Sequence, residues 1–427
     1  MIFLESMLFR LIAFLMTSSV HCDILFPKDT STDFVFPPKI RRSTSGVPDG
    51  HLRPLGWQRP PEGKVPEITE APEPKTFWES HVRDKKPLVM RQAINQSSDC
   101  FVKWNDKYLK NTYGDVIIEV TKKKPGKIEE PHMMTLKKFL LRYNLEDWYL
   151  VSPIPPPMTT EVPAIKSLLC GTFRDFLQEA EMWMSSGGTS SPIHYDQDHN
   201  IHCLIAGRKD FIMVHPKFKD RFEMKENKEI GNGYSTIDAE MVNVYDHPKV
   251  GKTAWKWSTL WPGDCIYLPA GHLHQVRSYG RSLSTSILWT PTRAFNDTGC
   301  AVTNMSEPVA LSELSFIWKL YDGQRLINTD NYDDPETLRH HLLALMRDDP
   351  KLPRERFFHY FEKARNDESR RKEQTPHAAF RQLDLKKKNY LTVRDIQRLP
   401  SNLLTRVVNN YIRPQADEVE ELLKDEL

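Results

Sequence analysis

The most constraining feature of the chain is a run of short strand-like segments between residues 181 and 290. The segments are rich in β-branched and aromatic residues, and Gly, Pro and Asp turns separate them. The clearest of them cover residues 182–184, 193–195, 211–214, 265–268 and 284–289. Such a density of short strands is typical of a sandwich or barrel, so we predict a mainly β core here.

The sequence on either side of this core predicts different structure. Residues 23–75 are rich in proline and lack a periodic apolar pattern, which predicts an extended arm. From Thr76 short helices and strands alternate towards the core. After Pro308 the apolar spacing becomes helical, and we predict helices over 312–321, 335–346 and 355–364. The domain boundaries that follow are an arm at 23–75, a core domain at 76–292 and a helical C-terminal region at 306–423.

The charge balance excludes one class of partner. Lys and Arg total 59 against 57 Asp and Glu, a formal net charge of +2. A nucleic-acid-binding protein normally carries a strong basic excess or stripe, so we expect no nucleic-acid partner. The short lysine runs at 122–124 and 386–388 fit solvated surfaces.

Residues 1–22 resemble a secretory signal, with a short apolar stretch over 8–16 followed by small residues. The stretch is too short to span a bilayer, and the alternative for it is a buried N-terminal helix. No other apolar run is long enough to cross a membrane, so we expect no membrane span.

Residues 424–427 spell the endoplasmic-reticulum retrieval tetrapeptide. Its four residues are Lys424, Asp425, Glu426 and Leu427. Together with the signal it predicts a protein of the endoplasmic-reticulum lumen that binds the retrieval receptor. Three N-glycosylation sequons, beginning at Asn95, Asn296 and Asn304, fit a lumenal chain.

The cysteine count has a consequence in an oxidising lumen, although the sequence fixes no pairing. Of six, Cys22 falls near the predicted cleavage point, and the five that remain are an odd number. At least one free thiol or an intermolecular bond is therefore expected. Cys203 and Cys265 lie in apolar strand-like runs, which predicts buried thiols, and the spacings fit no zinc-finger pattern.

A chemical constellation lies in the predicted core. His194 and Asp196 are two residues apart, so on a strand they point to the same side. A histidine and a carboxylate placed in this way are two thirds of a facial triad, which suits Fe(II) because it leaves coordination positions open. The third ligand must come from another strand, and His272 and His274 follow a later strand, again two residues apart.

Taken together, these motifs resemble the JmjC and cupin-like 2-oxoglutarate oxygenases, specifically the small JmjC-only hydroxylases. The matching elements lie at 187–196, 199–200, 206–209 and 214–216, followed by the Pro-Gly-Asp turn at 262–264 and by 268–276. They occur in the family's order, and the resemblance covers roughly residues 76–292. It implies a double-stranded β-helix, the jelly-roll or cupin barrel, with flanking helices.

The resemblance also assigns roles to individual residues. It makes His194, Asp196 and His274 the Fe(II) ligands, Lys209 the partner of the distal carboxylate of 2-oxoglutarate, and Ser191, Asn200 and Tyr149 hydrogen-bonding partners of that co-substrate. A buried dicarboxylate needs such a cation, because an unpaired buried charge is costly.

The implied reaction consumes O2 and 2-oxoglutarate, releases succinate and CO2, and hydroxylates a positioned C–H bond. The function that fits best is hydroxylation of a side chain on a secretory-pathway protein. One alternative is a non-catalytic lumenal cupin-type binding or scaffold protein. A demethylase is less consistent with the secretory signals, and the chain has no Cys/His reader module.

The C-terminal region contains the outline of an EF-hand loop, within an EF-hand-like segment at 380–395. The loop begins at Asp384 and ends at Asp395, but Lys386 and Lys388 occupy ligand positions and Asn389 replaces the usual glycine. Ammonium groups stand where Ca²⁺ needs oxygen, so we predict that the loop binds no calcium. We expect the helical tail to serve in homodimerisation or in substrate docking.

Overall fold

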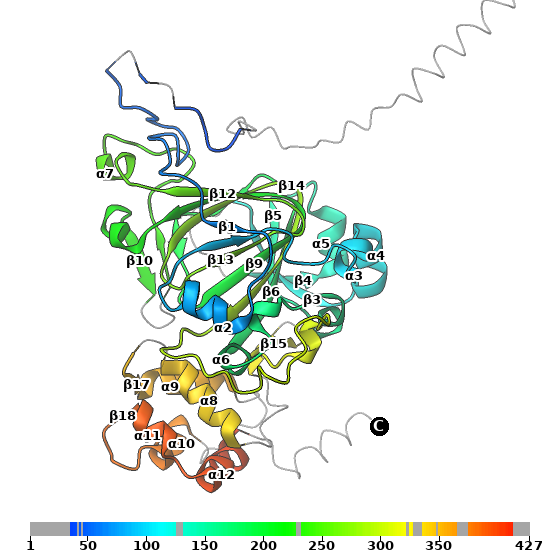
Figure 1. The fold of residues 1–427 in the computed structure, drawn as a ribbon, viewed down its shortest axis with the longest axis vertical. Helices are drawn as coiled ribbons and strands as arrows, with labels where there is room; N and C mark the ends of the chain where they lie inside the picture. The colour runs from blue at the N-terminus through cyan, green and yellow to red at the C-terminus, as the bar shows by residue number, and fades with distance from the viewer. Residues whose placement is uncertain are drawn as a thin grey trace, which may run out of the picture.

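The structure is a computed structural model that describes residues 35–40, 42–43, 46–124, 131–227, 232–321, 324–327, 335–346, 349–364 and 375–412. The predicted signal at 1–22 and the retrieval tetrapeptide at 424–427 lie outside the described residues. A β-rich body carries a smaller helical unit at one end (Figure 1).

The body is built from fourteen strands in one connected sheet system. They are β1 (Glu67–Ile68), β2 (Leu88–Met90), β3 (Ile117–Lys122), β4 (His132–Thr135), β5 (Trp148–Pro153), β6 (Leu177–Ser185), β7 (Thr189–Ser190), β8 (His194–Tyr195), β9 (His199–Val214), β10 (Met224–Asn227), β11 (Asn232–Ser235), β12 (Lys256–Leu260), β13 (Cys265–Leu268) and β14 (Leu273–Trp289). Its helices are α2 (Pro74–Phe77), α3 (Asp99–Lys103), α4 (Asp106–Tyr113), α5 (Leu136–Arg142), α6 (Thr172–Asp175) and α7 (Pro248–Gly251). The strand segments named at 182–184, 211–214, 265–268 and 284–289 lie within these strands, and the one named at 193–195 corresponds to β8, which begins one residue later at His194.

Two long antiparallel strands, β9 and β14, organise the body. The first half of β9 pairs with β13 and its second half with β12, while the first half of β14 pairs with β7 and β8 and its second half with β6. Each long strand therefore belongs to two sheets. Two sheets that share their long strands form a double-stranded β-helix, as predicted.

A glycine changes which side of β9 faces inward. Asn200 and His202 point into the barrel before Gly207, whereas Lys209 and Phe211 do so after it. Gly207 has a φ of +86°, and a Cβ there would lie 2.6 Å from the Arg281 carbonyl oxygen. A residue with a side chain could not make this bend, so the glycine brings Lys209 to the interior.

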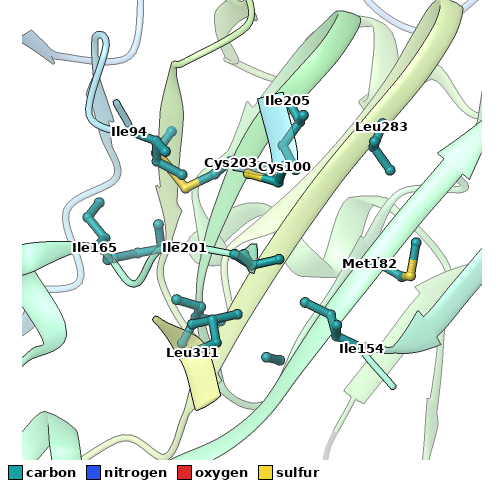
Figure 2. Packing of buried hydrophobic residues seen from close by; sticks show 14 of the residues in the cluster. Ile94, Cys100, Ile154, Ile165, Met182, Ile201, Cys203, Ile205, Leu283 and Leu311 are labelled. Atoms are coloured by element: carbon teal, nitrogen blue, oxygen red, sulfur yellow. A yellow bond between two sulfur atoms is a disulfide. The ribbon is translucent and has the colours of Figure 1, made fainter. Parts of the chain in front are cut away.

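The largest apolar cluster lies between the barrel and its flanking helices (Figure 2). It joins aliphatic residues of several strands, such as Met182, Ile201 and Leu283, to residues of the helical flank. The helices begin where their sequences supply a cap: the Asn105 side chain accepts a hydrogen bond from the backbone nitrogen of Tyr108 at the start of α4.

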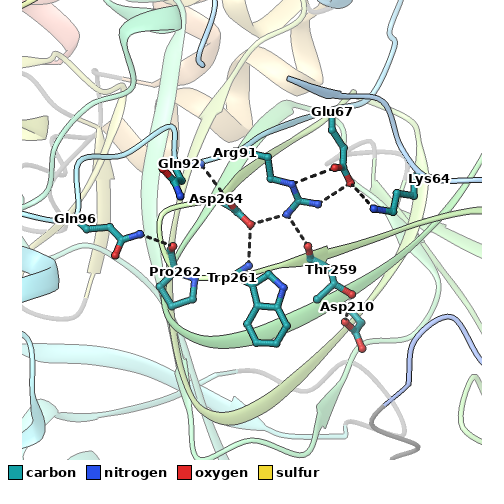
Figure 3. Close-up of polar contacts among 10 residues, drawn as sticks. All are labelled: Lys64, Glu67, Arg91, Gln92, Gln96, Asp210, Thr259, Trp261, Pro262 and Asp264. Carbon is teal, nitrogen blue, oxygen red and sulfur yellow. Dashed lines mark hydrogen bonds and ion pairs between the residues drawn. The ribbon is translucent and has the colours of Figure 1, made fainter. Parts of the chain in front are cut away.

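The proline-rich arm packs on the body over its described part. Val65 is fully buried, and β1 adds a parallel strand beside β2. Figure 3 shows the link: Arg91 contacts Glu67 and Asp264, each at 2.6 Å. Asp264 also accepts a hydrogen bond from the backbone nitrogen of Trp261, which closes the Pro-Gly-Asp turn. Over its described residues the arm combines turns with extended segments, and it packs on the barrel as part of its outer layer.

Two disulfides are present among the described residues. Cys203 and Cys265 face each other across β9 and β13 and are bonded, so the prediction of buried thiols was wrong. Strand alternation predicts on which face of a strand a cysteine lies, but it does not predict which strands become neighbours. Cys170 pairs with Cys300, and Cys100 is a buried free thiol within the described part of the chain.

The C-terminal unit contains four short strands and five helices within the described residues. These are β15 (Trp318–Tyr321), β16 (Gln324–Ile327), β17 (Lys351–Pro353), β18 (Tyr390–Thr392), α8 (Pro335–Met346), α9 (Arg354–Ala364), α10 (Pro376–Leu383), α11 (Val393–Gln397) and α12 (Ser401–Tyr411). The helices predicted at 335–346 and 355–364 are present. The helix predicted at 312–321 is wrong, because 318–321 form a hairpin with 324–327 that satisfies the backbone across strands.

The helical unit has the arrangement of two paired EF-hands. The segments α8–β17–α9 and α10–β18–α11 are joined through their loops, where Leu352 pairs with Leu391. In the second loop Lys386 and Lys388 lie 2.8 and 2.5 Å from the Asp395 carboxylate. Two ammonium groups thus neutralise the last acid of the loop, in keeping with the prediction of a loop that takes no calcium.

Candidate metal centre and co-substrate pocket

The three predicted ligands converge in the barrel. His194 on β8 and His274 on β14 are direct cross-strand partners, and their ring centroids are 4.1 Å apart. Asp196 follows β8, and its Oδ2 lies 3.8 Å from His274 Nε2. One ligand atom from each of the three lies within 4.8 Å of the others. Residues up to 80 positions apart in sequence therefore bring two imidazoles and a carboxylate together.

Backbone carbonyls orient both imidazoles. His194 Nδ1 lies 3.0 Å from the Pro192 oxygen, and His274 Nδ1 lies 3.1 Å from the His272 oxygen. A protonated Nδ1 donates in each case, which leaves Nε2 with its lone pair free for a metal. His272 contributes only its backbone carbonyl, which orients His274. Of the two histidines that the sequence offered as the third ligand, only His274 therefore belongs to the cluster.

Burial keeps His274 in the form that a metal requires. Desolvation, followed by the neighbouring His194, lowers the pKa of His274 to about 4, although Asp196 opposes the shift. The imidazole is therefore neutral at physiological pH, and a neutral imidazole is the metal-binding form.

A cavity of about 430 Å³ adjoins the three ligands. This volume is in the range of small-molecule sites. All four residues predicted to contact the co-substrate line it: Tyr149, Ser191, Asn200 and Lys209. The structure thus brings every predicted metal and co-substrate residue to one cavity.

Lys209 is the cation of this cavity, and it is completely buried. Its Nζ lies 3.3 Å from the Tyr149 hydroxyl and over the rings of Tyr149 and Trp183, 5.8 and 5.9 Å from their centroids. Desolvation lowers the pKa of Lys209 to about 7. A buried ammonium with so little compensation is suited to an anionic ligand.

Sequence reasoning missed two other lining residues, Trp183 and His202. Within the described residues, Trp183 Nε1, His202 Nε2 and Asn200 Oδ1 are buried without a hydrogen-bond partner. Such groups are costly unless a ligand or water satisfies them. Strand alternation could have identified His202, because it lies two residues from Asn200 and therefore on the same face of β9.

The mouth of the cavity is acidic on the barrel side. Glu179 and Glu181 of β6 and Asp198 line it and are mostly buried. The C-terminal unit contributes Arg356 and His359 of α9 to the lining, and the Arg356 guanidinium lies 3.6 Å from the Asp349 carboxylate of the same unit.

The donors fit a divalent metal with a dicarboxylate beside it. Two imidazole nitrogens and one carboxylate form the facial set that leaves coordination positions open on Fe(II). A carboxylate-bearing molecule would find matching partners beside this set. They are the Lys209 ammonium, the Tyr149 hydroxyl and the neighbouring buried polar atoms that lack a hydrogen bond.

Comparison with known proteins agrees with this geometry. The family model of the cupin-like domain matches residues 74–295, which is more than half of the chain. The chain belongs to the cupin-like domain family. The JmjC proteins of this family are Fe(II)- and 2-oxoglutarate-dependent oxygenases, and the donor set described above fits that cofactor class.

Several curated relatives match parts of the chain. Jumonji C domain-containing protein 5 of Drosophila melanogaster is 34% identical over 26% of this chain and 27% of its own. Lysine-specific demethylase 8 of Xenopus tropicalis is 23% identical over 54% of this chain and 53% of its own. Lysine-specific demethylase JMJ30 of Arabidopsis thaliana is 28% identical over 44% of this chain and 46% of its own. The chain thus spans about half or less of these relatives' lengths.

Among the described residues, none of the helices combines the length and the apolar character needed to cross a bilayer.

Proposed function

We propose that this protein is an Fe(II)- and 2-oxoglutarate-dependent dioxygenase that hydroxylates a side chain of a secretory-pathway protein. The observation that carries the proposal is the convergence of His194, Asp196 and His274 on the cavity that also contains Lys209. The balanced reaction converts a substrate C–H bond, O2 and 2-oxoglutarate into an alcohol, succinate and CO2.

The chain's own residues would hold and orient the reactants. His194, Asp196 and His274 would bind the iron, which supplies the oxidising chemistry when bound. The Lys209 ammonium would pair with the distal carboxylate of 2-oxoglutarate, and the Tyr149 hydroxyl beside it would donate a second hydrogen bond. The buried walls would keep water from the reacting atoms.

A basic side chain fits the substrate side of the cavity. The carboxylates of Glu179, Glu181 and Asp198 line the barrel side of the mouth, where a cation would be favoured. Two of the relatives carry lysine specificity in their names. We therefore propose a lysine side chain as the first substrate to test.

The proposed compartment is the endoplasmic-reticulum lumen. Two disulfides support it, because such bonds persist in oxidising compartments. The asparagines of all three sequons, Asn95, Asn296 and Asn304, are exposed, so glycans would meet no steric obstacle in the fold. The tetrapeptide at 424–427 would provide retrieval.

The test begins with purified protein and anaerobic Fe(II). We expect metal-dependent binding of 2-oxoglutarate, followed by succinate release when air is admitted. A panel of synthetic peptides with a central lysine, N-methyl-lysine or arginine should then reveal which one accelerates succinate formation. Failure of the metal-loaded, folded protein to bind 2-oxoglutarate would favour the non-catalytic scaffold.

Mass spectrometry of the peptide separates hydroxylation from demethylation. The names of the relatives make demethylation the second candidate. Gain of one oxygen atom on unmodified lysine supports a hydroxylase, whereas loss of a methyl group from the N-methyl-lysine peptide supports a demethylase.

A further inference from the structure

The cavity is closed on one side by the C-terminal unit. Residues of β15, α8 and α9 line the same cavity as the three ligands; they are Trp318, Ala344, Leu345, Arg356, His359 and Tyr360. Figure 1 shows α8 and α9 next to the end of the barrel. The unit that follows the barrel in sequence therefore completes its pocket.

Specific contacts hold this wall of the cavity, which is formed by β15, α8 and α9, against the barrel. The backbone nitrogen of Ile317 donates to the Leu177 oxygen at 3.1 Å, and Trp318 Nε1 donates to Gln178 Oε1 at 3.3 Å. The rings of Phe176 and His340 lie 6.1 Å apart. All three contacts join the unit to the segment at the start of β6, where the acidic lining begins.

The C-terminal unit that forms this wall has its own apolar core, and lysine side chains lie beside the last acid of its second loop. The apolar cluster of the unit contains none of the described barrel residues; it includes Leu338, Leu342, Phe357, Phe361, Phe380, Leu391, Leu404 and Val407. The lysine contacts to Asp395 take the place of calcium in its second loop. The apolar cluster and these lysine contacts stabilise the unit that lines this side of the pocket.

Most of the lining groups of this wall are already engaged within it. Arg356 Nη1 donates to the Leu345 and Met346 oxygens at the end of α8, and the Tyr360 hydroxyl bonds His341 Nδ1 at 2.9 Å. His359 is exposed and makes no hydrogen bond or ion pair with the described residues. The Trp318 side chain is half-buried: it packs against the apolar cluster of the unit and donates its Nε1 hydrogen to Gln178, and its remaining surface is exposed.

We propose that this wall is the substrate-positioning surface of the enzyme, on which His359 donates a hydrogen bond to the peptide backbone and Trp318 packs on a residue flanking the target lysine. The inference rests on the proposed function. The Glu179 and Glu181 carboxylates of β6 would attract the lysine ammonium, so the lysine runs along β6. The peptide backbone then faces α9, where its carbonyl oxygens meet the His359 imidazole.

Photo-crosslinking tests the contact directly. A benzophenone amino acid replaces His359 in the full chain, and a fluorescent lysine peptide is the probe, with Fe(II) and 2-oxoglutarate present anaerobically. Matched variants carry the group at Arg354, exposed on α9 but outside the cavity, and at Asn232 on the barrel side of it. We expect crosslinking at 359 and 232 but not at 354.

Affinity measurements test the hydrogen bond. Loss of one hydrogen bond lowers the affinity about fivefold. We expect His359→Leu to weaken binding of the lysine peptide by about this factor and His359→Gln, which keeps a donor, to bind as the wild type does. Binding of 2-oxoglutarate should be unchanged in both, and a Trp318→Phe variant should keep the peptide affinity closer to wild type than Trp318→Ala.

The outcomes separate the two proposals. Crosslinking at 232 alone, or at neither position, in protein that binds and turns over 2-oxoglutarate would overturn the positioning wall and leave the dioxygenase intact. Equal peptide affinity in His359→Leu and wild type would also overturn it. Absence of 2-oxoglutarate binding by the wild type would overturn both.

Discussion

At the scale of the residue, the site depends on a few side chains whose environments are set by burial. His274 and Lys209 are both completely enclosed, and desolvation lowers both pKa values, to about 4 and about 7. A metal needs the neutral imidazole, whereas a carboxylate needs the charged lysine. Desolvation thus keeps His274 in the neutral form that binds a metal. It also makes co-substrate binding depend on protonation of Lys209.

The first prediction concerns the metal ligands. We expect His194→Ala or Asp196→Ala to reduce succinate formation more than about 100-fold, because even outer-shell partners of a metal are worth 10–100-fold. The fold should survive, since both side chains are partly exposed at the cavity. His132→Ala, an exposed histidine on β4, is the control. Unchanged turnover in both ligand variants would remove the iron from this position.

The second prediction concerns pH. Binding of 2-oxoglutarate should weaken about tenfold per pH unit above about 7, because Lys209 must then take up a proton. Calorimetry in buffers of different ionisation enthalpy should detect the uptake. Lys209→Ala should raise the 2-oxoglutarate requirement severely, and Lys209→Arg, always charged, should lose the pH dependence. A pH-independent affinity in the wild type would exclude this role.

The same shift has a consequence for the free protein. The folded pKa of Lys209 lies below its unfolded value, so the unfolded chain binds more protons between about pH 7 and about pH 10.4. The contribution of this group to stability therefore rises with pH across that window.

At the scale of the element, the long strands β9 and β14 do most of the positioning. They place His202, Lys209 and His274 on the inner surface, and the bend at Gly207 changes the inward side of β9. The disulfide between Cys203 and Cys265 ties β9 to β13 beside this inner surface.

The third prediction concerns that bond. It joins residues 62 apart, and a chain-entropy model assigns a loop of this length about 4 kcal/mol of stabilisation. We expect the double variant Cys203→Ala and Cys265→Ala to lower the free energy of unfolding by about this amount, measured by urea denaturation. Cys100→Ala, which removes a buried free thiol, is the control and should cost about 1 kcal/mol. Equal losses in the two proteins would mean that the crosslink adds nothing.

At the scale of the whole molecule, the barrel is incomplete as a pocket without the C-terminal unit. The arm adds an outer strand, and α8 and α9 close the cavity mouth. The predicted homodimer through the tail stays a prediction. The proposed retrieval address belongs to this scale too, because a retrieval receptor would bind it on the intact protein.

The fourth prediction concerns that address. Deletion of residues 424–427 should release the protein into the medium of secreting cells, because the retrieval receptor reads this tetrapeptide. Immunoblotting of cells and medium measures the distribution. Glu420→Ala with Glu421→Ala, just upstream, should leave retention unchanged. Continued retention of the deletion variant would show that another contact holds the protein.

The sequence by itself determined the barrel and the chemistry of its site. Strand alternation placed His194 and Asp196 on one side, and the order of the motifs identified the family and the lysine. These features are local patterns of residue type and spacing, so a single sequence displays them.

Only the tertiary structure decided the rest. The pairing of Cys203 with Cys265 and the position of Trp183 beside Lys209 depend on which strands become neighbours. The strand at 318–321 replaced a predicted helix, because pairing across the hairpin outweighs helical spacing. The closure of the cavity by α9 arises from contacts between parts of the chain more than 100 residues apart, such as Trp318 with Gln178, and no local pattern encodes such a contact.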